Sequence, residues 1–285
     1  MPEPDEAPIL NVESLNVHYR GAATPAVQNV SFTLGRERLG IVGESGSGKS
    51  TVGRALLKLL PTADISAQSL MFQGNSLLAL SEKQMLGIRG KKISMILQDP
   101  KFSLNPIRRC GDQISEAYRT HFKCKQAEAK SRALEMLEAV QIRNPERVYQ
   151  MYPHEVSGGM GQRIMIAMML LTQPDMVIAD EPTSALDVTV RLQVLEILDK
   201  LVSEKGIGLI MISHDLNLVR NFCDRVLIMY AGRVVESLKA SELDQAQHPY
   251  TQGLLAAQPR IGGSRADLPV LKRQENWTTG SAVSS

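Results

Sequence analysis

Residues 39–51 read LGIVGESGSGKST, and this stretch decides the fold. An apolar run, 39–42, leads into the loop GESGSGKS at 43–50, which fits the pattern GxxxxGK[ST] of a phosphate-binding loop between a strand and a helix. Glycines let such a loop curl so that its N–H groups and the helix N-terminus converge on phosphates. The sequence therefore predicts a nucleoside triphosphate site, with Mg²⁺ held by the Ser50 hydroxyl. Its expected nucleotide contacts are Gly43, Glu44, Ser45, Gly46, Ser47, Gly48, Lys49, Ser50 and Thr51.

The segments around this loop predict an α/β protein. Upstream, apolar residues recur at Leu10, Val12, Leu15 and Val17, and with the run 27–34 they predict an antiparallel β layer. Downstream, the helical stretch TVGRALLKLL at 51–60 is expected to stop at Pro61. A helical insertion is predicted over about 99–152, with Ala129, Ala133, Met136, Leu137 and Val140 on its buried face. Alternating helices and strands are then predicted at 158–171, 176–179, 190–202, 209–212, 216–221 and 226–230, with a hairpin turn at 231–232.

Composition excludes several classes of protein. The 285 residues carry 32 Lys and Arg against 30 Asp and Glu, a net charge of +2 that argues against a dedicated nucleic-acid partner. The longest apolar runs fall well short of the roughly 20 residues of a membrane-spanning helix. The start, MPEPDEAP, is unlike a signal peptide, which predicts a cytoplasmic location. Three widely spaced cysteines suggest neither a disulfide framework nor a zinc site.

A second sequence element, which ends in two acidic residues, complements the phosphate loop. The run MVIADE at 176–181 is an apolar strand that ends in two acids. Asp180 is placed to hold Mg²⁺ through water, and Glu181 is placed to polarise the attacking water. An apolar strand ending in acids is common, so this element points to nucleotide hydrolysis only in combination with residues 43–50.

Further motifs resemble those of the ATP-binding cassette (ABC) family, in that family's order. The segment VSGGM at 156–160 resembles its signature motif, in which Ser157, Gly158 and Gly159 would bind the ATP held by a second subunit. This resemblance implies that Gln98 in ILQDP senses the γ-phosphate and Mg²⁺, and that His214 in MISHD is the switch histidine. It also implies that Asp187 in SALD belongs to the D-loop and that Tyr19 stacks on adenine.

The same resemblance implies a fold and a domain plan. We expect a P-loop NTPase cassette with a RecA-like core, an antiparallel β subdomain and a helical insertion. The expected plan is a flexible tail at 1–8, an ABC ATPase domain at 9–257 with a helical subdomain at about 99–172, and a partly disordered extension at 258–285. Catalysis would rest on Glu181, His214 and Lys49, and Mg²⁺ would be held by Ser50, Gln98 and Asp180.

Within the family, the chain is most similar to ATPase subunits of peptide and nickel importers. The motifs behind this are QDP at 98–100, SLNP at 103–106, DVTV at 187–190 and HPYTQ at 248–252. The similarity implies a peripheral subunit on the cytoplasmic face of the inner membrane. Its partners would be two permeases, an extracytoplasmic solute-binding protein and a second ATPase, either non-identical, which we favour, or a copy of this chain. The cargo stays open among peptides, nickel and other small solutes such as opines.

The sequence also departs from its subgroup and leaves alternatives open. Met160 stands where many members have Gln, so a side-chain contact from that position is in doubt, and the role of the C-terminal tail is open. No NKxD motif supports a GTPase, and no long coiled coil splits the cassette as in DNA-repair members. A non-transport, regulatory nucleotide-binding module is the remaining alternative, and a turnover assay with permease partners would separate it from a transporter.

Overall fold

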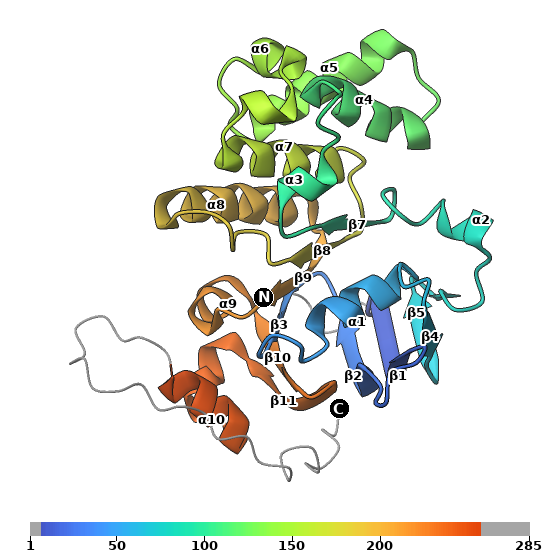
Figure 1. Cartoon of the computed structure of the whole chain (residues 1–285), viewed down its shortest axis with the longest axis vertical. Coiled ribbons are helices and arrows are strands. Elements are labelled where there is room, and N and C mark those ends of the chain that lie inside the picture. The colour runs from blue at the N-terminus through green and yellow to red at the C-terminus, as the bar shows by residue number, and fades with distance from the viewer. Residues whose placement is uncertain (1–6, 258–285) are drawn as a thin grey trace. The chain divides into compact units, whose positions relative to one another are not determined.

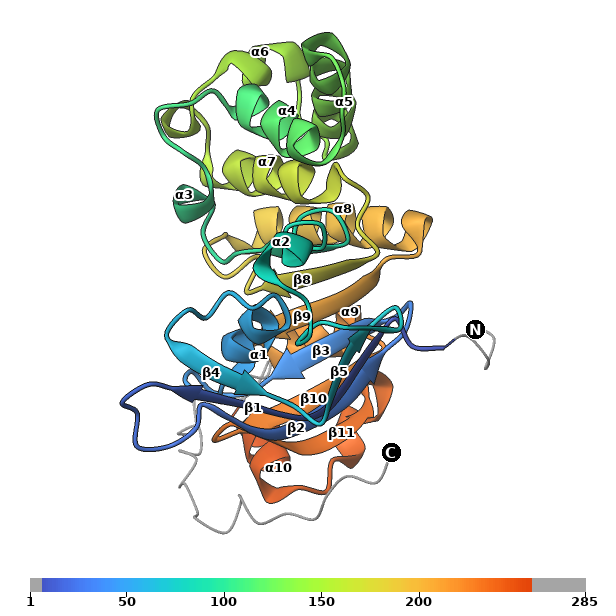
Figure 2. The same ribbon diagram turned by 90° about the vertical axis from the view of Figure 1, so that its right-hand side faces the viewer.

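The computed structural model describes residues 7–257. The predicted C-terminal extension and most of the predicted N-terminal tail lie outside the described residues. The described residues form two compact units, one of residues 7–79 with 210–257 and one of Leu80–Leu209. No helix among residues 7–257 is both long and apolar enough to cross a bilayer. Figures 1 and 2 show the elements of each unit in two views.

The first unit contains an antiparallel sheet. Its strands pair in the order β2-β1-β5-β6, and β4 also pairs with β1. The strands are β1 (Leu10–Tyr19), β2 (Val27–Leu34), β4 (Ala63–Ser66), β5 (Ser69–Phe72) and β6 (Asn75–Ser76). The antiparallel layer predicted from residues 9–34 is confirmed, but β4 to β6, which complete the sheet, were not predicted.

A bulge in β1 explains an irregularity in the apolar pattern. Leu10 and Val12 are even-numbered whereas Leu15 and Val17 are odd-numbered, although all four are buried. The pairing of β1 with β2 shifts register on both sides of Leu15, and Ser14 has a left-handed φ of 53°. One extra residue reverses the alternation of a strand, so the bulge returns the later apolar side chains to the buried face.

A second group of strands carries the phosphate loop. Within the first unit the strand order is β11-β10-β3-β9, with β10 parallel to β3 and antiparallel to β11. The strands are β3 (Arg38–Val42), β9 (Gly208–Ser213), β10 (Arg225–Tyr230) and β11 (Arg233–Lys239). The helices of this unit are α1 (Lys49–Leu56), α9 (Leu216–Phe222), α10 (Pro249–Ala256) and the 3-10 helix η2 (Ala240–Gln245). The predicted turn between β10 and β11 is confirmed, since Ala231 and Gly232 both have positive φ, at 47° and 80°.

The predicted extent of the first helix was wrong. We expected residues 51–60, ending at Pro61, but α1 starts at Lys49 and ends at Leu56. Lys58 takes a left-handed φ of 52°, which a right-handed helix cannot include, and its ammonium donates to the carbonyl of Leu78 at 3.3 Å. Local backbone geometry thus ends the helix before the proline is reached.

The second unit contains two parallel strands and most of the helices. The strands are β7 (Ile93–Ile96) and β8 (Met176–Asp180), every residue of which is buried. The helices are α2 (Glu82–Met85), α3 (Pro100–Ser103), α4 (Cys110–His121), α5 (Gln126–Ala139), α6 (Pro145–Gln150), the 3-10 helix η1 (Pro153–Glu155), α7 (Gly158–Leu170) and α8 (Val188–Lys205). Helix α7 lies between the α4 and α5 layer and α8, and contacts all three (Figure 1).

The apolar face predicted for the helical insertion is confirmed. Its five members are at most 7% exposed: Ala129, Ala133, Met136, Leu137 and Val140.

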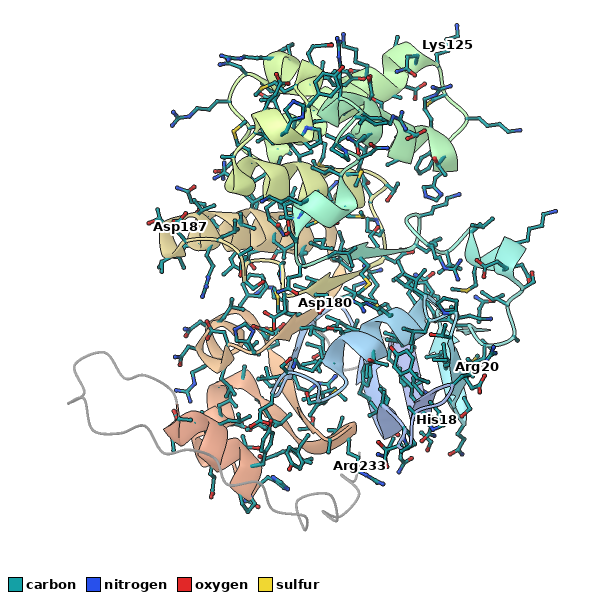
Figure 3. All side chains as sticks on the ribbon, in the orientation of Figure 1. His18, Arg20, Lys125, Asp180, Asp187 and Arg233 are labelled. Atoms are coloured by element: carbon teal, nitrogen blue, oxygen red, sulfur yellow. The ribbon has the colours of Figure 1, made fainter. Side chains whose placement is uncertain are left out.

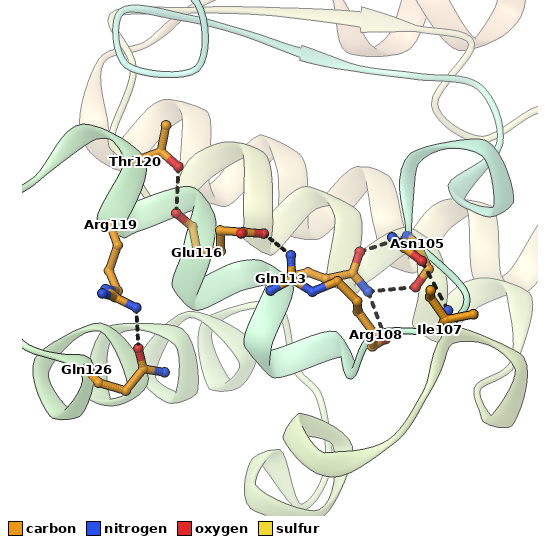
Figure 4. Close-up of polar contacts among 8 residues, drawn as sticks. All are labelled: Asn105, Ile107, Arg108, Gln113, Glu116, Arg119, Thr120 and Gln126. Atoms are coloured by element: carbon orange, nitrogen blue, oxygen red, sulfur yellow. Dashed lines mark hydrogen bonds and ion pairs between the residues drawn. The ribbon is translucent and has the colours of Figure 1, made fainter.

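Polar contacts join α4 to the loop that precedes it (Figure 4). The side-chain amide of Gln113 accepts from the Asn105 N–H at 2.8 Å and donates to the carbonyls of Asn105 and Arg108, both at 3.0 Å. The side chain of Gln113 in α4 therefore holds the backbone of the SLNP motif at Asn105.

Candidate functional site

The loop between β3 and α1 has the curled backbone that a phosphate cradle needs. Gly46 and Gly48 have φ of +82° and +98°, which side chains with a Cβ rarely adopt. A Cβ on Gly43 would lie 2.1 Å from the Met229 carbonyl oxygen, and one on Gly48 would lie 2.5 Å from that of Ala26. Larger residues at Gly43 and Gly48 would therefore displace backbone of β10 or of the segment before β2.

Lys49 sits inside this loop. The residue is only 7% exposed, and its ammonium donates to the carbonyls of Gly43 at 2.8 Å and Glu44 at 2.7 Å. The first turn of α1, with half-buried Ser50 and Thr51, follows directly, and no side chain caps that helix. A fixed ammonium beside a helix N-terminus gives a positive potential that suits phosphate oxygens.

The other predicted residues of the first unit lie at strand ends. Tyr19 is half-buried at the end of β1, opposite Ala63 of β4. His214 is exposed directly after β9. The next residue, Asp215, caps α9 by accepting from the Leu218 N–H at 3.1 Å, and its own N–H donates to the Ser213 hydroxyl at 3.0 Å. These bonds fix the backbone on both sides of His214, and its role and that of Tyr19 stay predictions.

The predicted acids of the second unit follow β8 directly. Asp180 is the last residue of the strand and is 4% exposed, and Figure 3 labels it there. Glu181 has a left-handed φ of 51°, which is uncommon for a residue with a side chain. The carbonyl of Glu181 accepts from the Ser184 N–H at 3.3 Å and from the Ser184 hydroxyl at 3.2 Å. This turn holds Glu181 in a conformation that a regular strand would not give it.

Gln98 and the signature residues also belong to the second unit. Gln98 is exposed in the segment between β7 and α3, and the Asp99 carboxylate caps α3 by accepting from the Lys101 N–H at 2.8 Å. Ser157 caps α7 by accepting from the Met160 N–H at 3.3 Å. Gly158 is exposed, and a Cβ there would have no atom within 4 Å, whereas Gly159 packs against Val190. The expected helix start at the signature is therefore present.

Asp187 occupies the corresponding place on α8. Its carboxylate accepts from the Val190 N–H at 3.1 Å, so the aspartate caps the helix (Figure 3).

The predicted site residues are divided between the two units. Residues 43–51, Tyr19 and His214 belong to one unit, and the remaining residues belong to the other: Gln98, Ser157, Gly158, Gly159, Asp180, Glu181 and Asp187. No group of three His, Cys, Asp or Glu residues within 7–257 could hold a metal ion by itself.

One residue that contacts the phosphate loop was missed by the sequence reasoning. The Tyr250 hydroxyl accepts a hydrogen bond from the Glu44 N–H at 3.0 Å, although the two residues lie 206 positions apart. Its only sequence signal was the HPYTQ motif, which suggests a subgroup of importers and no contact with the loop. A backbone hydrogen bond also attaches the loop to the turn after β10, since the Gly232 N–H donates to the Ser47 carbonyl at 3.1 Å.

Comparison with known proteins decides the family. The family model described as ABC transporter matches residues 27–184, more than half of the chain. The chain belongs to the ABC transporter family. It is 46% identical to the oligopeptide transport ATP-binding protein OppD of Salmonella typhimurium, over 91% of this chain and 79% of that protein. It is 44% identical to the dipeptide transport ATP-binding protein DppD of Bacillus subtilis, over 91% and 79% of the two chains.

Solved structures agree with this assignment. A dimeric, post-hydrolysis ATP-binding cassette, MJ0796 bound to ADP and Pi, is 26% identical to this ABC protein with a TM-score of 0.72, covering 81% of this chain and 98% of that one. CbiO1 of Clostridium perfringens, part of the transporter complex cbiONQ, is 27% identical with a TM-score of 0.73, covering 84% and 92%. The α/β cassette fold is therefore confirmed. The chain is an ATP-binding, ATP-hydrolysing cassette of an ABC transporter.

Proposed function

We propose that this ABC ATPase powers the import of peptides, or of a related small solute, through membrane permeases. The observation that carries the proposal is the phosphate loop closed around the buried ammonium of Lys49, with 2.8 Å to the Gly43 carbonyl. The choice of peptides is supported by relatives at 44–46% identity that are named for oligopeptide and dipeptide transport.

ATP would be bound by residues 43–51, with adenine against Tyr19. Lys49 already lies between two carbonyls of the loop, so phosphate oxygens that enter the cradle meet an ordered cation at little entropic cost. The exposed N-terminus of α7, with Ser157, Gly158 and Gly159, suits the γ-phosphate of an ATP held by a second subunit. The working assembly would then be a dimer of ATPase subunits with two shared nucleotides.

The chemistry of three predicted side chains suits a magnesium ion. Mg²⁺ prefers oxygen ligands, and the donor set of Ser50, Gln98 and Asp180 offers a hydroxyl, an amide and a carboxylate. When bound, Mg²⁺ neutralises charge on the phosphates. In this proposal Ser50 holds it from the first turn of α1 and Asp180 holds it from the end of β8, with Gln98 completing the set.

Hydrolysis would rest on Glu181 and His214. Glu181 would accept the proton of the attacking water, and the turn that bonds its carbonyl to Ser184 fixes the Glu181 backbone directly after β8. His214 would hold the γ-phosphate, and Asp187 would lie at the interface between the two ATPase subunits. The partners we propose are two permeases, a solute-binding protein outside the membrane, and a non-identical second ATPase at the cytoplasmic face of the inner membrane.

The test is ATP turnover and solute uptake by the complex of this chain with its permeases in proteoliposomes. We expect ATP-dependent uptake of peptides that is lost with Lys49→Ala, because the cradle then lacks its cation. ATP affinity of the isolated chain, measured by calorimetry, should fall with it. Lys83→Ala, which changes an exposed lysine of α2, is the control and should leave both unchanged. Uptake of nickel but not of peptides would reject the proposed cargo and leave the ATPase assignment intact.

A further inference from the structure

The last described helix, α10, contacts the phosphate loop through the side chain of Tyr250. Tyr250 lies in the first turn of α10 and is fully buried, at 0% exposure. Its hydroxyl accepts from the Glu44 N–H at 3.0 Å. Within the phosphate pattern Glu44 directly follows the first glycine, so this bond reaches the start of the loop.

The same residue, Glu44, is bound on its other side by Lys49. Its carbonyl accepts from the Lys49 ammonium at 2.7 Å, while its N–H donates to Tyr250. The peptide groups on the two sides of Glu44 therefore connect the tyrosine hydroxyl with the lysine that is expected to face the phosphates. The Glu44 N–H therefore already has a partner within the protein, and this bond anchors the start of the loop.

Surrounding contacts hold Tyr250 in place. Its ring packs against Tyr230, the last residue of β10, with ring centroids 4.6 Å apart. The start of α10 is fixed to β11, because the Glu236 carboxylate accepts from the N–H groups of Gln247 at 2.7 Å and His248 at 3.2 Å. The His248 imidazole then accepts from the Tyr250 N–H at 3.2 Å, which caps the helix. A hydroxyl on such a rigid ring can fix a loop that is otherwise rich in glycine.

We propose that Tyr250 is a positioning residue for nucleotide binding, which orders the phosphate loop and the ammonium of Lys49 before ATP arrives. The inference rests on the proposed role of Lys49 in binding ATP. Loss of the hydroxyl would leave the Glu44 N–H without that partner and let the loop sample other conformations. Ordering the loop would then become part of the cost of binding ATP.

Tyr250→Phe is the direct test because it removes the hydroxyl and keeps the ring. The matched control is Tyr149→Phe in α6, since Tyr149 is also buried, at 3% exposure, and its hydroxyl lies 2.8 Å from that of Ser115. One hydrogen bond is worth roughly 0.5–1.5 kcal/mol, so Tyr250→Phe should weaken ATP and ADP binding about 2- to 12-fold by calorimetry. The KM for ATP should rise by a similar factor, with kcat changed less than about 2-fold.

The outcomes separate a positioning role from a structural one. Tyr149→Phe should lower the melting temperature without changing nucleotide affinity. Equal affinities for Tyr250→Phe and the wild type, or an equal loss in both variants, would overturn the inference. Absence of ATP binding by the wild type would instead overturn the proposed function.

A measurement without nucleotide tests the same contact if Tyr250→Phe does not fold. In the wild-type protein the Glu44 amide hydrogen should exchange with solvent much more slowly than that of exposed Ser45. In a folded Tyr250→Phe protein the difference should shrink. Equally fast exchange of the Glu44 and Ser45 amides in the wild type would show that the Tyr250 bond is not formed in solution, and the inference would be rejected.

Discussion

Gly159 lies against Val190, so closely that a Cβ on the glycine would come within 2.5 Å of the Val190 Cγ1 atom. The contact joins the first turn of α7, which carries the signature, to the first turn of α8, which Asp187 caps. The first turns of α7 and α8 can therefore approach this closely only because residue 159 is a glycine. A side chain at position 159 would overlap Val190.

The two signature glycines should tolerate alanine very differently. Gly159→Ala should destabilise the protein by about 1–3 kcal/mol in chemical denaturation, because the methyl group overlaps Val190. Gly158→Ala has open space and should leave the free energy of unfolding unchanged or slightly raised, since alanine favours helix. Adding Val190→Ala to Gly159→Ala should restore most of the loss. A Gly159→Ala protein as stable as the wild type would refute this packing argument.

Glu181→Gln should separate ATP binding from hydrolysis. The amide keeps the size of the side chain but cannot accept the proton of water, so turnover should fall about 10²- to 10⁴-fold while ATP still binds. Phosphate release and calorimetry measure the two properties. Glu138→Gln, on the exposed surface of α5, should behave as wild type. Turnover of Glu181→Gln at the wild-type rate would remove Glu181 as the general base.

The three cysteines should differ in reactivity. All are free thiols; Cys110 and Cys223 are buried, while Cys124 is half-buried. Burial raises the pKa of the Cys110 thiol to about 11, so at pH 8 only about one molecule in a thousand carries the thiolate there. Burial also raises the pKa of Cys223. Iodoacetamide at pH 8 should modify Cys124 first, as mass spectrometry of tryptic peptides would show, and the other two only after unfolding. Equal rates at Cys110 and Cys124 would contradict this order.

His121 should make stability depend on pH in the acidic range. Burial, and next the charge of Lys91, lower the pKa of His121 below its ordinary value of 6.5. Below pH 6.5 the unfolded chain therefore binds a proton that the folded His121 lacks, and stability should fall as the pH drops. Urea unfolding at several pH values should show a shallower decline for His121→Gln than for the wild type. Identical pH dependence in the two proteins would exclude His121 as the cause.

Sequence patterns predicted the local features of this ABC cassette well. The strand at 27–34 and the helix start at 158 are found as expected, because apolar periodicity and glycine or serine punctuation act over a few residues. The end of α1 was misplaced, since the left-handed Lys58 has no recognisable signal. Strands β4 to β6 were missed because strands of two to four residues carry too short an apolar pattern and are stabilised mainly by their neighbours.

By itself, the sequence determined the phosphate loop, the acids after an apolar strand, and the family, because these depend on residue types at fixed spacing along the chain. Tertiary structure alone decided which distant groups support that loop. The Tyr250 hydroxyl on the Glu44 N–H joins residues 206 positions apart, and the Val190 methyl group that requires Gly159 lies on another helix. Such contacts arise from the packing of whole elements, and no local pattern of residues encodes them.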